Sequence, residues 1–582
     1  MNRSEMMINM IPNIRITAAR LVALLVLVAL FCAGVQAAVA AEQTLTIAVS
    51  TTGGQIGIGD SLGTDPTIHK DVIPGSAGIQ DYHYYTHFSP LITLDSDANI
   101  IPWMAESYEV SDDLKTIAFH MRKGVTFADG TQLNASVLKF NFDRMLTYGL
   151  KERFGNQTKA NIFVNFDYCE ASDDNTFKIH FTKGWLDMAT ELACNHIYGN
   201  FINPNDVDPA WDIRGILKPE KKYNGLGPYY VDENESVPKE KVVLKRRHSW
   251  RDDLDFHKPM LDKIVLTLIA DPQTAVMALE KGEVDYICRY WNVPLDSLSA
   301  LEKNPTISIK TAPETRMYYL FTAYWKEPFN GTDGILLRKA ICYALNKTEI
   351  IDGAFNGYAM LATDSMGLSP LRSDAPECCH KGYDYELEKA KQLLSEAGWN
   401  DTDGDGILDK NGKALKDLDF VIDSSSSLIW QKDLAVMVQS QLKMIGIDVS
   451  IRSLETAAFT ETFKTGDYDL KMSYNMGRYN PLTQEIRGFN LNEVYGIYLN
   501  HYGNQNETLE TAVTKAQKTT SKDERSRYVC QVCNILYEEA GIIPLVYEMQ
   551  YAVMNNKVKG FQFGPSKMCY YLDHVEECRI ED

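Results

Sequence analysis

The alternation of hydrophobic and polar positions in Ile101–Met145 predicts a β-hairpin, a second turn and then a helix. Strand-forming residues fill Tyr108–Val110 and Thr116–Met121, and the polar residues between them supply turn chemistry. Asn134 carries a side-chain oxygen that can accept a hydrogen bond from a free amide at a helix N-terminus. Beyond it, apolar residues recur on one helical face, at Leu138, Phe142 and Met145. We interpret this stretch as a packing unit without chemistry of its own.

Two later stretches share a strand–helix–strand pattern. The first runs through Asp262–Leu268, Pro272–Lys281 and Gly282–Tyr286, and the second through Asp448–Ile451, Thr456–Lys464 and Gly466–Leu470. Units of this kind place parallel strands in a sheet with the helix on one face. The repetition predicts two α/β lobes that are built from similar local units.

Length and composition indicate a large soluble protein. The chain has 582 residues, too many for one ordinary hydrophobic core, so two or three domains or lobes are expected. Hydrophobic residues make up 45% and charged residues 23%, as is typical of soluble globular proteins. The formal net charge of -20 argues against nucleic acid or an anionic membrane surface as a main partner.

The first forty residues have the pattern of a targeting segment. Arginines precede the apolar run Leu21–Phe31, which is too short to span a bilayer comfortably. Ala38-Val-Ala40 then supplies a small-residue cleavage site, so we expect export and cleavage before Ala41 or Glu42. The alternatives are an uncleaved membrane anchor and acylation at Cys32, and the bulky residue before Cys32 disfavours the second.

Cysteine usage fits an exported protein. Since one cysteine lies in the leader, ten of the 11 remain, and an even number in an oxidising compartment fits disulfides as well as buried thiols. Cys378 and Cys379 are adjacent, and Cys530 and Cys533 form a Cys-x-x-Cys within a helical pattern. A thioredoxin-like motif would follow a strand instead, so structural cysteines are expected. Their pairing cannot be deduced from the sequence.

An acidic loop offers a candidate metal site. Carboxylates occupy positions 1, 3, 5 and 9 of a calcium-loop pattern, at Asp401, Asp403, Asp405 and Asp409. Position 6 is the expected glycine, but position 12 is Gly412 in place of a bidentate glutamate. Two interpretations stay open, a weakly bound structural calcium or an Asp/Gly turn without an ion. No cofactor is expected to be required.

A secreted hydrolase and a thiol- or metal-based protein are the rival classes. A hydrolase of the zinc type would need a His-Glu-x-x-His helix, which the sequence lacks. A thiol or metal protein would rely on the Cys-x-x-Cys and on Cys378-Cys-His380. We expect a binding protein and not an enzyme.

Taken together, short motifs along the chain resemble one family. They are Pro102–Met104, Ala105–Ser107, Val110–Asp113, Phe119–Gly124, Val125–Phe127, Asp129–Gly130, Gly225–Tyr229, His248–Trp250, Gly282–Asp285, Arg338–Lys347 and Lys389–Trp399. Each motif is weak alone, but their number and order are similar to those of the family 5 extracellular solute-binding proteins of ABC importers. These proteins take peptides, nickel chelates and related solutes.

The resemblance implies an α/β, two-lobed periplasmic-binding-protein fold of type II, in the large class with an extra subdomain in the first lobe. The expected organisation is a signal peptide at 1–40, lobe 1 at 41–314 with the subdomain at about 85–225 and completion by 545–582, and lobe 2 at 315–544. The lobes would close on a solute by a hinge motion. The implied partners are an ABC permease and ATPase subunits, and we expect a monomer in the periplasm or on the extracellular face of the cytoplasmic membrane.

The sequence determines the identity of the solute less well than it determines the family. Peptide binders of this family commonly carry an aspartate before a proline in lobe 2, which pairs with the amine of the peptide. This chain has Asn480 at that place. A neutral amide forms a weaker hydrogen bond with the peptide's ammonium group than a carboxylate does. Nickel-chelate binders have a similar run in which Gly477, Tyr479 and Pro481 fit. We therefore expect a nickel chelate or small carboxylated solute, with a di- or oligopeptide as the alternative. The candidate ligand-binding residues are Tyr82, His83, Tyr85, Phe154, Met476, Arg478 and Tyr479.

Overall fold

A computed structural model describes most of the chain. The described residues are 42–49, 85–86, 89–144, 165–194, 199, 201–207, 224–237, 240–248, 258–288, 293–363, 375–424, 430–474, 482, 507–565 and 573–581. Residues 44–582 form one compact unit, to which the following description applies.

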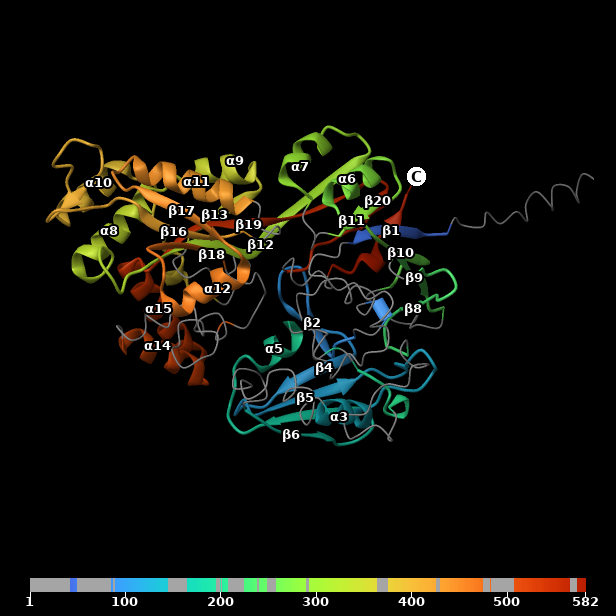
Figure 1. Cartoon of the computed structure of the whole chain (residues 1–582). Helices are drawn as coiled ribbons and strands as arrows, with labels where there is room; N and C mark the ends of the chain where they lie inside the picture. Colours follow the sequence, from blue (N-terminus) through green and yellow to red (C-terminus); the bar gives the residue numbers. More distant parts are fainter. Residues whose placement is uncertain are drawn as a thin grey trace, which may run out of the picture. The chain divides into compact units, whose positions relative to one another are not determined.

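One 11-stranded mixed sheet organises this unit (Figure 1). Its strands follow in the order β17 (Val449–Leu454), β16 (Leu418–Asp423), β18 (Leu470–Tyr474), β12 (Ile307–Thr322), β19 (Ile542–Asn555), β11 (Tyr286–Ile287), β1 (Thr44–Val49), β10 (Lys263–Leu268), β9 (Lys241–Arg246) and β8 (Tyr229–Val231). The remaining strand, β13 (Ala359–Leu361), pairs with β19.

The two strand–helix–strand stretches occupy equivalent places in the two halves of this sheet. Strand β1 lies between β10 and β11 and is parallel to both, and β16 lies in the same way between β17 and β18. The connecting helices are α6 (Pro272–Glu280) and α12 (Thr456–Thr465). The predicted similarity of these local units is therefore visible in the strand pairing.

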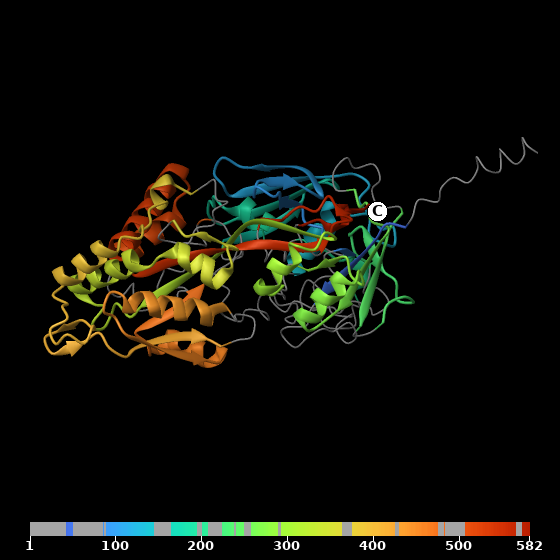
Figure 2. The same cartoon turned by 90° about the horizontal axis from the view of Figure 1, so that it is seen from above.

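Strands β12 and β19 join the two halves, and Figure 2 shows the red strand β19 running through the centre of the molecule. They are antiparallel over most of their length, with a register shift between Pro313 and Met317. On one side of this bulge β12 also pairs with β18, and beyond the other side β19 pairs with β11. The bulge is thus the point at which one half of the sheet passes into the other.

A separate four-stranded antiparallel sheet contains the predicted hairpin. Its strands are β4 (Ala105–Val110), β5 (Thr116–Met121), β7 (Thr176–Phe181) and β6 (Phe166–Ala171), in that order. Helix α3 (Ala135–Arg144) follows, and its Val137 amide donates to the Asn134 side chain at 3.0 Å, as predicted. Leu138 and Phe142 are fully buried under the sheet, whereas Met145 lies outside the described residues.

Helices cover both faces of the half-sheet formed by β16, β17 and β18. One apolar core lies against α8 (Gly331–Ala344), α9 (Lys347–Phe355), α10 (Leu387–Glu396) and α11 (Trp430–Lys443). A different core, on the other face, includes residues of α12, α14 (Glu507–Lys518) and α15 (Lys522–Glu539). This half of the main sheet is thereby packed against buried side chains on both faces.

Around β1 and β10 the core is completed by residues from the C-terminal tail. Two short strands, β20 (Val558–Lys559) and β21 (Arg579–Ile580), pair there, and the helical turn η13 (Val575–Glu577) lies close in sequence. The remaining elements are α5 (Met188–Cys194), α7 (Leu295–Leu301), the turns η5 (Pro204–Asp206) and η7 (Glu377–Cys379), and the strand pairs β2 (Ile92–Leu94) with β3 (Ile100–Pro102) and β14 (Asp409–Lys410) with β15 (Lys413–Ala414).

Within the described part of the chain, none of the helices combines the length and apolarity that a membrane span requires. The lobe boundary predicted at residues 314 and 315 falls in the β12 bulge, and the domain boundaries stay a prediction.

Candidate functional site

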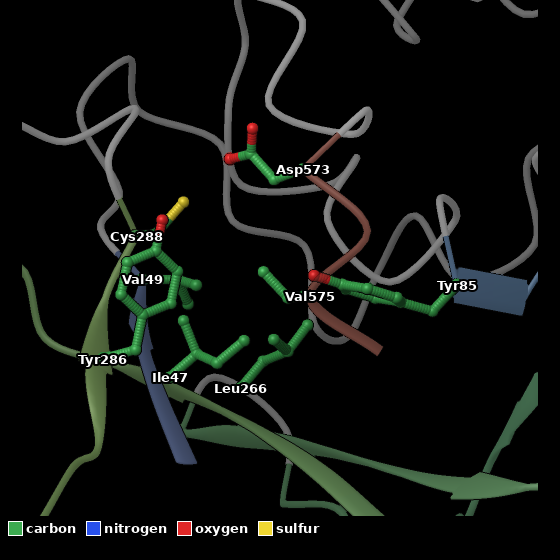
Figure 3. Close-up of a pocket in the computed structure, with 8 residues that line it drawn as sticks. All are labelled: Ile47, Val49, Tyr85, Leu266, Tyr286, Cys288, Asp573 and Val575. Atoms are coloured by element: carbon green, nitrogen blue, oxygen red, sulfur yellow. The ribbon is translucent and has the colours of Figure 1, made fainter. Parts of the chain in front are cut away.

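A pocket opens where the parallel strands of the first half-sheet end (Figure 3). In open α/β sheets, ligands bind outside the carboxyl ends of the strands, and this pocket collects residues from β1, β10 and β11 at those ends. Its lining residues are Ile47, Val49, Tyr85, Leu266, Tyr286, Cys288, Asp573 and Val575. The fold thus brings together side chains that are more than 500 residues apart in the sequence.

The pocket combines apolar side chains with a small polar set. Figure 3 shows the Tyr85 and Tyr286 rings on opposite sides, with the Asp573 carboxylate on a third side. Asp573 is 3% exposed, and its Oδ1 accepts a hydrogen bond from the Gly564 amide at 2.6 Å. The eight lining residues include no lysine, arginine or histidine. Such a lining favours a solute group that donates hydrogen bonds or carries positive charge.

Gly227 of a family motif lies against the backbone of Tyr85, and Arg247 ties this motif to a second one. A side chain at Gly227 would collide with the backbone carbonyl of Tyr85, and the Gly227 amide donates to the Thr86 carbonyl at 2.8 Å. The Arg247 guanidinium donates to the carbonyls of Gly227 and Phe127 at 2.9 Å each. Burial lowers the pKa of Arg247 to about 10. The motifs around residues 127 and 227 therefore meet beside the pocket and position it.

The carboxyl ends of the second half-sheet carry a charged cluster. Tyr474 ends β18, and the Arg316 guanidinium lies 5.1 Å from the centre of its ring. Arg316 also pairs with Glu548 of β19, with Nη1 3.6 Å from Oε2, and both side chains are largely buried. This cluster lies at the β12 bulge and directly before the predicted ligand-binding residues 476–479 in the sequence.

A buried lysine lies on the same strand, three residues before Tyr474. Lys471 of β18 is fully buried, and its Nζ donates to the Phe459 carbonyl at 2.7 Å and to the Thr462 hydroxyl at 2.6 Å. The same nitrogen lies 3.9 Å from the centre of the Phe459 ring. Burial of the ammonium group lowers the pKa of Lys471 to about 6. Because Lys471 is fully buried, any change in its charge takes place inside the core and not at the surface.

The predicted ligand-binding residues have different outcomes. Tyr85 lines the pocket. The other candidates lie outside the described residues, so their roles stay predictions: Tyr82, His83, Phe154, Met476, Arg478 and Tyr479. Three further lining residues, Asp573, Tyr286 and Cys288, were not among the predicted ligand-binding residues. For the last two a signal existed, because the predicted strand that starts at Gly282 ends beside them.

The acidic loop adopts a turn that gathers three of its four predicted ligands. Carboxylate oxygens of Asp401, Asp403 and Asp405 lie within 4.8 Å of one another, and all three residues are exposed. Asp409 differs, because its Oδ1 and Oδ2 accept from the Thr402 hydroxyl at 2.6 Å and amide at 2.9 Å. These bonds to Thr402 lower the pKa of Asp409. Hydrogen bonds within the loop stabilise this turn. Calcium binding by the loop stays a prediction.

The cysteines that the sequence left unpaired form two neighbouring disulfides. Cys378 bonds to Cys530, and Cys379 bonds to Cys533, so the adjacent pair is joined to one face of α15. The first disulfide is half-buried and the second is fully buried. Five further cysteines in the described residues are buried and outside these two disulfides: Cys169, Cys194, Cys288, Cys342 and Cys578. This arrangement matches the structural role expected for these cysteines.

Comparison with known proteins gives consistent matches. A model of the bacterial extracellular solute-binding proteins, family 5 (middle), matches residues 99–493. The nickel-binding periplasmic protein of Escherichia coli (strain K12) is 28% identical over 421 residues, which cover 68% of this chain and 73% of that protein. The oligopeptide-binding protein AppA of Bacillus subtilis (strain 168) is 26% identical over 532 residues, which cover 90% and 91%.

Solved structures share the fold over nearly the whole chain. NikA from Brucella suis in complex with Fe(III)-EDTA superposes with a TM-score of 0.75 at 21% identity, covering 92% of this chain and 100% of that one. Bacillus subtilis AppA in complex with a nonapeptide gives a TM-score of 0.63 at 21% identity, covering 93% and 100%. The expected α/β, two-lobed architecture is confirmed by these neighbours.

Proposed function

Since the chain belongs to the bacterial extracellular solute-binding proteins, family 5, and so is the solute-binding component of an ABC importer, we propose that its solute is a compact metal chelate or a similarly small molecule. The observation that carries this proposal is the pocket at the ends of β1, β10 and β11. The cavity is only about 10 Å³, which is room for about one water molecule, so it can take one donor group of the solute and not the whole solute. Two phenol groups and a buried carboxylate border its apolar floor. A chelate with amine or imidazole donors fits that chemistry.

The similarity to a nickel-binding protein supports the same class. A free carboxylate on the solute finds no cationic side chain among the eight lining residues, so in this proposal it is bound by the predicted Arg478.

A di- or oligopeptide is the second candidate. The oligopeptide-binding relative matches 90% of the chain, whereas the nickel-binding relative matches 68%. In this case the carboxylate of Asp573 would accept from the peptide's terminal ammonium group, replacing the aspartate that is missing before Pro481.

Analysis of what co-purifies with the native protein separates the two candidates. We expect mass spectrometry to detect a small organic molecule and elemental analysis to detect nickel or iron in the same sample. Calorimetric titration with nickel(II)–L-histidine should then show binding that Asp573→Asn weakens. Peptides in the eluate, together with binding of a tripeptide and none of nickel(II)–L-histidine, would replace the first candidate by the second.

We propose further that the chain has no catalytic activity of its own. Its relatives are named as binding proteins, and family 5 proteins deliver solute to an ABC permease driven by ATPase subunits. Gly59-Asp-Ser-Leu-Gly63 has the Gly-x-Ser-x-Gly spacing of hydrolases but lies outside the described residues. Hydrolysis of p-nitrophenyl acetate at a rate that Ser61→Ala abolishes would contradict this proposal.

Export, cleavage and a monomeric state belong to the same proposal. Its relatives are periplasmic or extracellular binding proteins, which supports export of this chain. N-terminal sequencing of the secreted protein should begin at residue 41 or 42, and light scattering should give the mass of one chain. We also propose that the acidic loop at residues 401–409 binds calcium weakly, as a structural ion away from the pocket.

A further inference from the structure

The two disulfides of this protein lie side by side and bring four sulfur atoms into one cluster. Cys378 and Cys379 are neighbours in η7, and their partners Cys530 and Cys533 lie about one helical turn apart on α15. The Sγ atoms of Cys378 and Cys379 are 4.0 Å apart. The Cα atoms are 5.6 Å apart in one disulfide and 5.1 Å apart in the other. All four sulfurs therefore come from two short segments that face each other.

Four sulfurs at this spacing match the geometry of a tetrahedral metal site. Zinc binds a cysteine sulfur at about 2.3 Å, so two sulfurs of a tetrahedral site with four cysteines lie about 3.8 Å apart. The separation of 4.0 Å between the Cys378 and Cys379 sulfurs is close to that value. Once both S–S bonds are broken, rotation of the side chains can bring the other sulfurs to a similar spacing. The Cys-x-x-Cys of α15 is also a common ligand spacing in structural zinc sites.

Contacts that involve no sulfur also hold the two segments together. The Lys381 Nζ, shortly after η7, donates to the Asn534 Oδ1 of α15 at 3.0 Å. The Tyr383 hydroxyl donates to the Tyr537 carbonyl of the same helix, and the two tyrosine rings stack with their centres 4.7 Å apart. Breaking the S–S bonds leaves these contacts in place. The four cysteines are therefore expected to stay next to one another as thiols.

The sulfur cluster has one side in the core and one side toward solvent. Cys379 and Cys533 are fully buried in the core that α15 shares with α12 and α14. Cys378 and Cys530 are half-buried. An ion can therefore enter from the half-buried side, while apolar side chains exclude water from the other side. An entry path of this kind is one requirement of a metal site.

We propose that the four cysteines form a zinc site, which binds one ion through four thiolates when the two disulfides are reduced. Thiolates in tetrahedral geometry favour zinc, whereas magnesium and calcium prefer oxygen ligands. The bound ion fastens η7 to α15 in place of the disulfides. This site shares no residue with the pocket and does not depend on the identity of the solute.

The site forms in two steps. In the first step a dithiol reductant passes two electrons and two protons to each disulfide, and the two sulfurs of the reductant join in a disulfide of their own. In the second step zinc binds the four sulfurs, and the four thiol protons go to solvent. Because the ligands must lose their protons, zinc binding should strengthen as the pH rises.

The first test compares zinc binding by the oxidised and the reduced protein. A phosphine reduces the native protein, breaking each disulfide and taking up oxygen from water as the phosphine oxide. Zinc is then added, and loosely bound zinc is removed on a desalting column without oxygen. Elemental analysis should find one zinc ion more per reduced chain than per oxidised chain. The oxidised protein controls for the other cysteines and for the acidic loop, because it keeps both.

Cobalt(II) in place of zinc identifies the ligands. The reduced protein should show the visible absorption of tetrahedral cobalt together with a thiolate-to-cobalt charge-transfer band. The double variant Cys378→Ser, Cys530→Ser should lose this spectrum, and its Kd for zinc should rise more than about 100-fold, since even a change outside the ligands costs about 10–100-fold.

Cys169→Ser is the matched control and should keep the cobalt spectrum and the zinc affinity. Cys169 is buried outside the cluster, and its Sγ donates to the Asp143 Oδ1 at 3.3 Å. A serine hydroxyl can make the same hydrogen bond, so this variant removes a buried thiol and keeps the contact.

Equal zinc contents of the oxidised and reduced protein would overturn the proposal, and so would a cobalt spectrum without the charge-transfer band. A cobalt spectrum of the double variant identical to that of the wild type would also overturn it, because the ion would then lie elsewhere. If reduction alone unfolds the protein, circular dichroism decides. Zinc should restore the folded spectrum, and a reduced chain that stays unfolded with zinc would contradict the site.

Discussion

Arg316 of β12 and Glu548 of β19 face each other at the bulge that joins the two halves of the main sheet, with the guanidinium Nη1 3.6 Å from the carboxylate Oε2. The Tyr318 hydroxyl donates to the same Oε2 at 2.9 Å. Arg316 lies in the bulge, outside the regular backbone pairing of the two strands, and its side chain links β12 to β19.

Glu548→Gln should destabilise the protein by about 3 kcal/mol or more, because it removes a buried carboxylate that faces Arg316 and accepts from Tyr318. Urea unfolding followed by circular dichroism measures this. The control is Glu283→Gln, which removes an exposed pair with Lys281 at 4.0 Å and should change the unfolding free energy by less than about 0.5 kcal/mol. A loss below about 1 kcal/mol for Glu548→Gln would contradict the argument, since that is the range of surface pairs.

The two disulfides should contribute to stability in a strongly non-additive way. They close loops with sequence separations of 152 and 154 residues, so each holds nearly the same loop. Replacing Cys378 and Cys530 by alanine leaves the loop closed by the other bond, and we expect a loss of about 1 kcal/mol or less. Replacing all four cysteines should cost about 5 kcal/mol through loop entropy. Thermal unfolding of the wild type, the two-alanine variant and the four-alanine variant measures these losses of stability. A first loss as large as the second would contradict the prediction.

Lys471 should give the unfolding free energy a distinct pH dependence. Burial lowers its pKa to about 6 in the folded protein, whereas in the unfolded chain it lies near the ordinary lysine value of 10.5. Between these values the unfolded chain binds more protons, so the contribution to stability rises with pH. We expect the stability difference between wild type and Lys471→Met to increase by about 1.4 kcal/mol per pH unit from pH 7 to 9.

Denaturant titrations at several pH values measure this difference. Lys464→Met is the matched control, because Lys464 lies on α12 and is 57% exposed, and its difference from wild type should stay flat. A flat difference for Lys471→Met as well would show that the ammonium group keeps its charge in the folded state.

Calcium should raise the melting temperature if the acidic loop binds it. With an affinity in the range of extracellular calcium modules, about 5 mM calcium adds about 1–2 kcal/mol and raises the midpoint by about 1–3 °C relative to EDTA. Asp403→Asn should remove this rise, whereas Asp417→Asn, at an exposed position outside the loop, should keep it. Identical melting curves in calcium and EDTA would mean that the loop is an Asp/Gly turn without an ion.

Local features of the fold were predictable from the sequence. The hairpin and its following helix were correct because strand alternation, turn residues and the Asn134 cap all act over a few residues. The repeated strand–helix–strand units were recognisable for the same reason. The resemblance of short motifs then indicated the family, and Arg247 shows why those motifs occur together, since it binds carbonyls from two of them.

The candidate site was mostly beyond sequence reasoning. Asp573 and Tyr85 line one pocket although 488 residues separate them, because a C-terminal tail returns to the ends of the first strands. The disulfide pairing was equally hidden: helical spacing places Cys530 and Cys533 on one face of α15, but nothing local identifies the adjacent pair as their partners. Contacts of this kind are fixed by topology, which a single sequence does not display.

The continuity of β19 through both halves of the main sheet has a consequence for when the protein can fold. This strand begins at Ile542 of 582 residues, and it pairs with β12, more than 200 residues earlier, as well as with β11 and β13. Neither half of the sheet is complete until this strand has been synthesised. Pairing between such distant segments is slow. A newly made chain therefore stays extended for longer than a protein of local contacts would, which is the state that a translocation channel accepts.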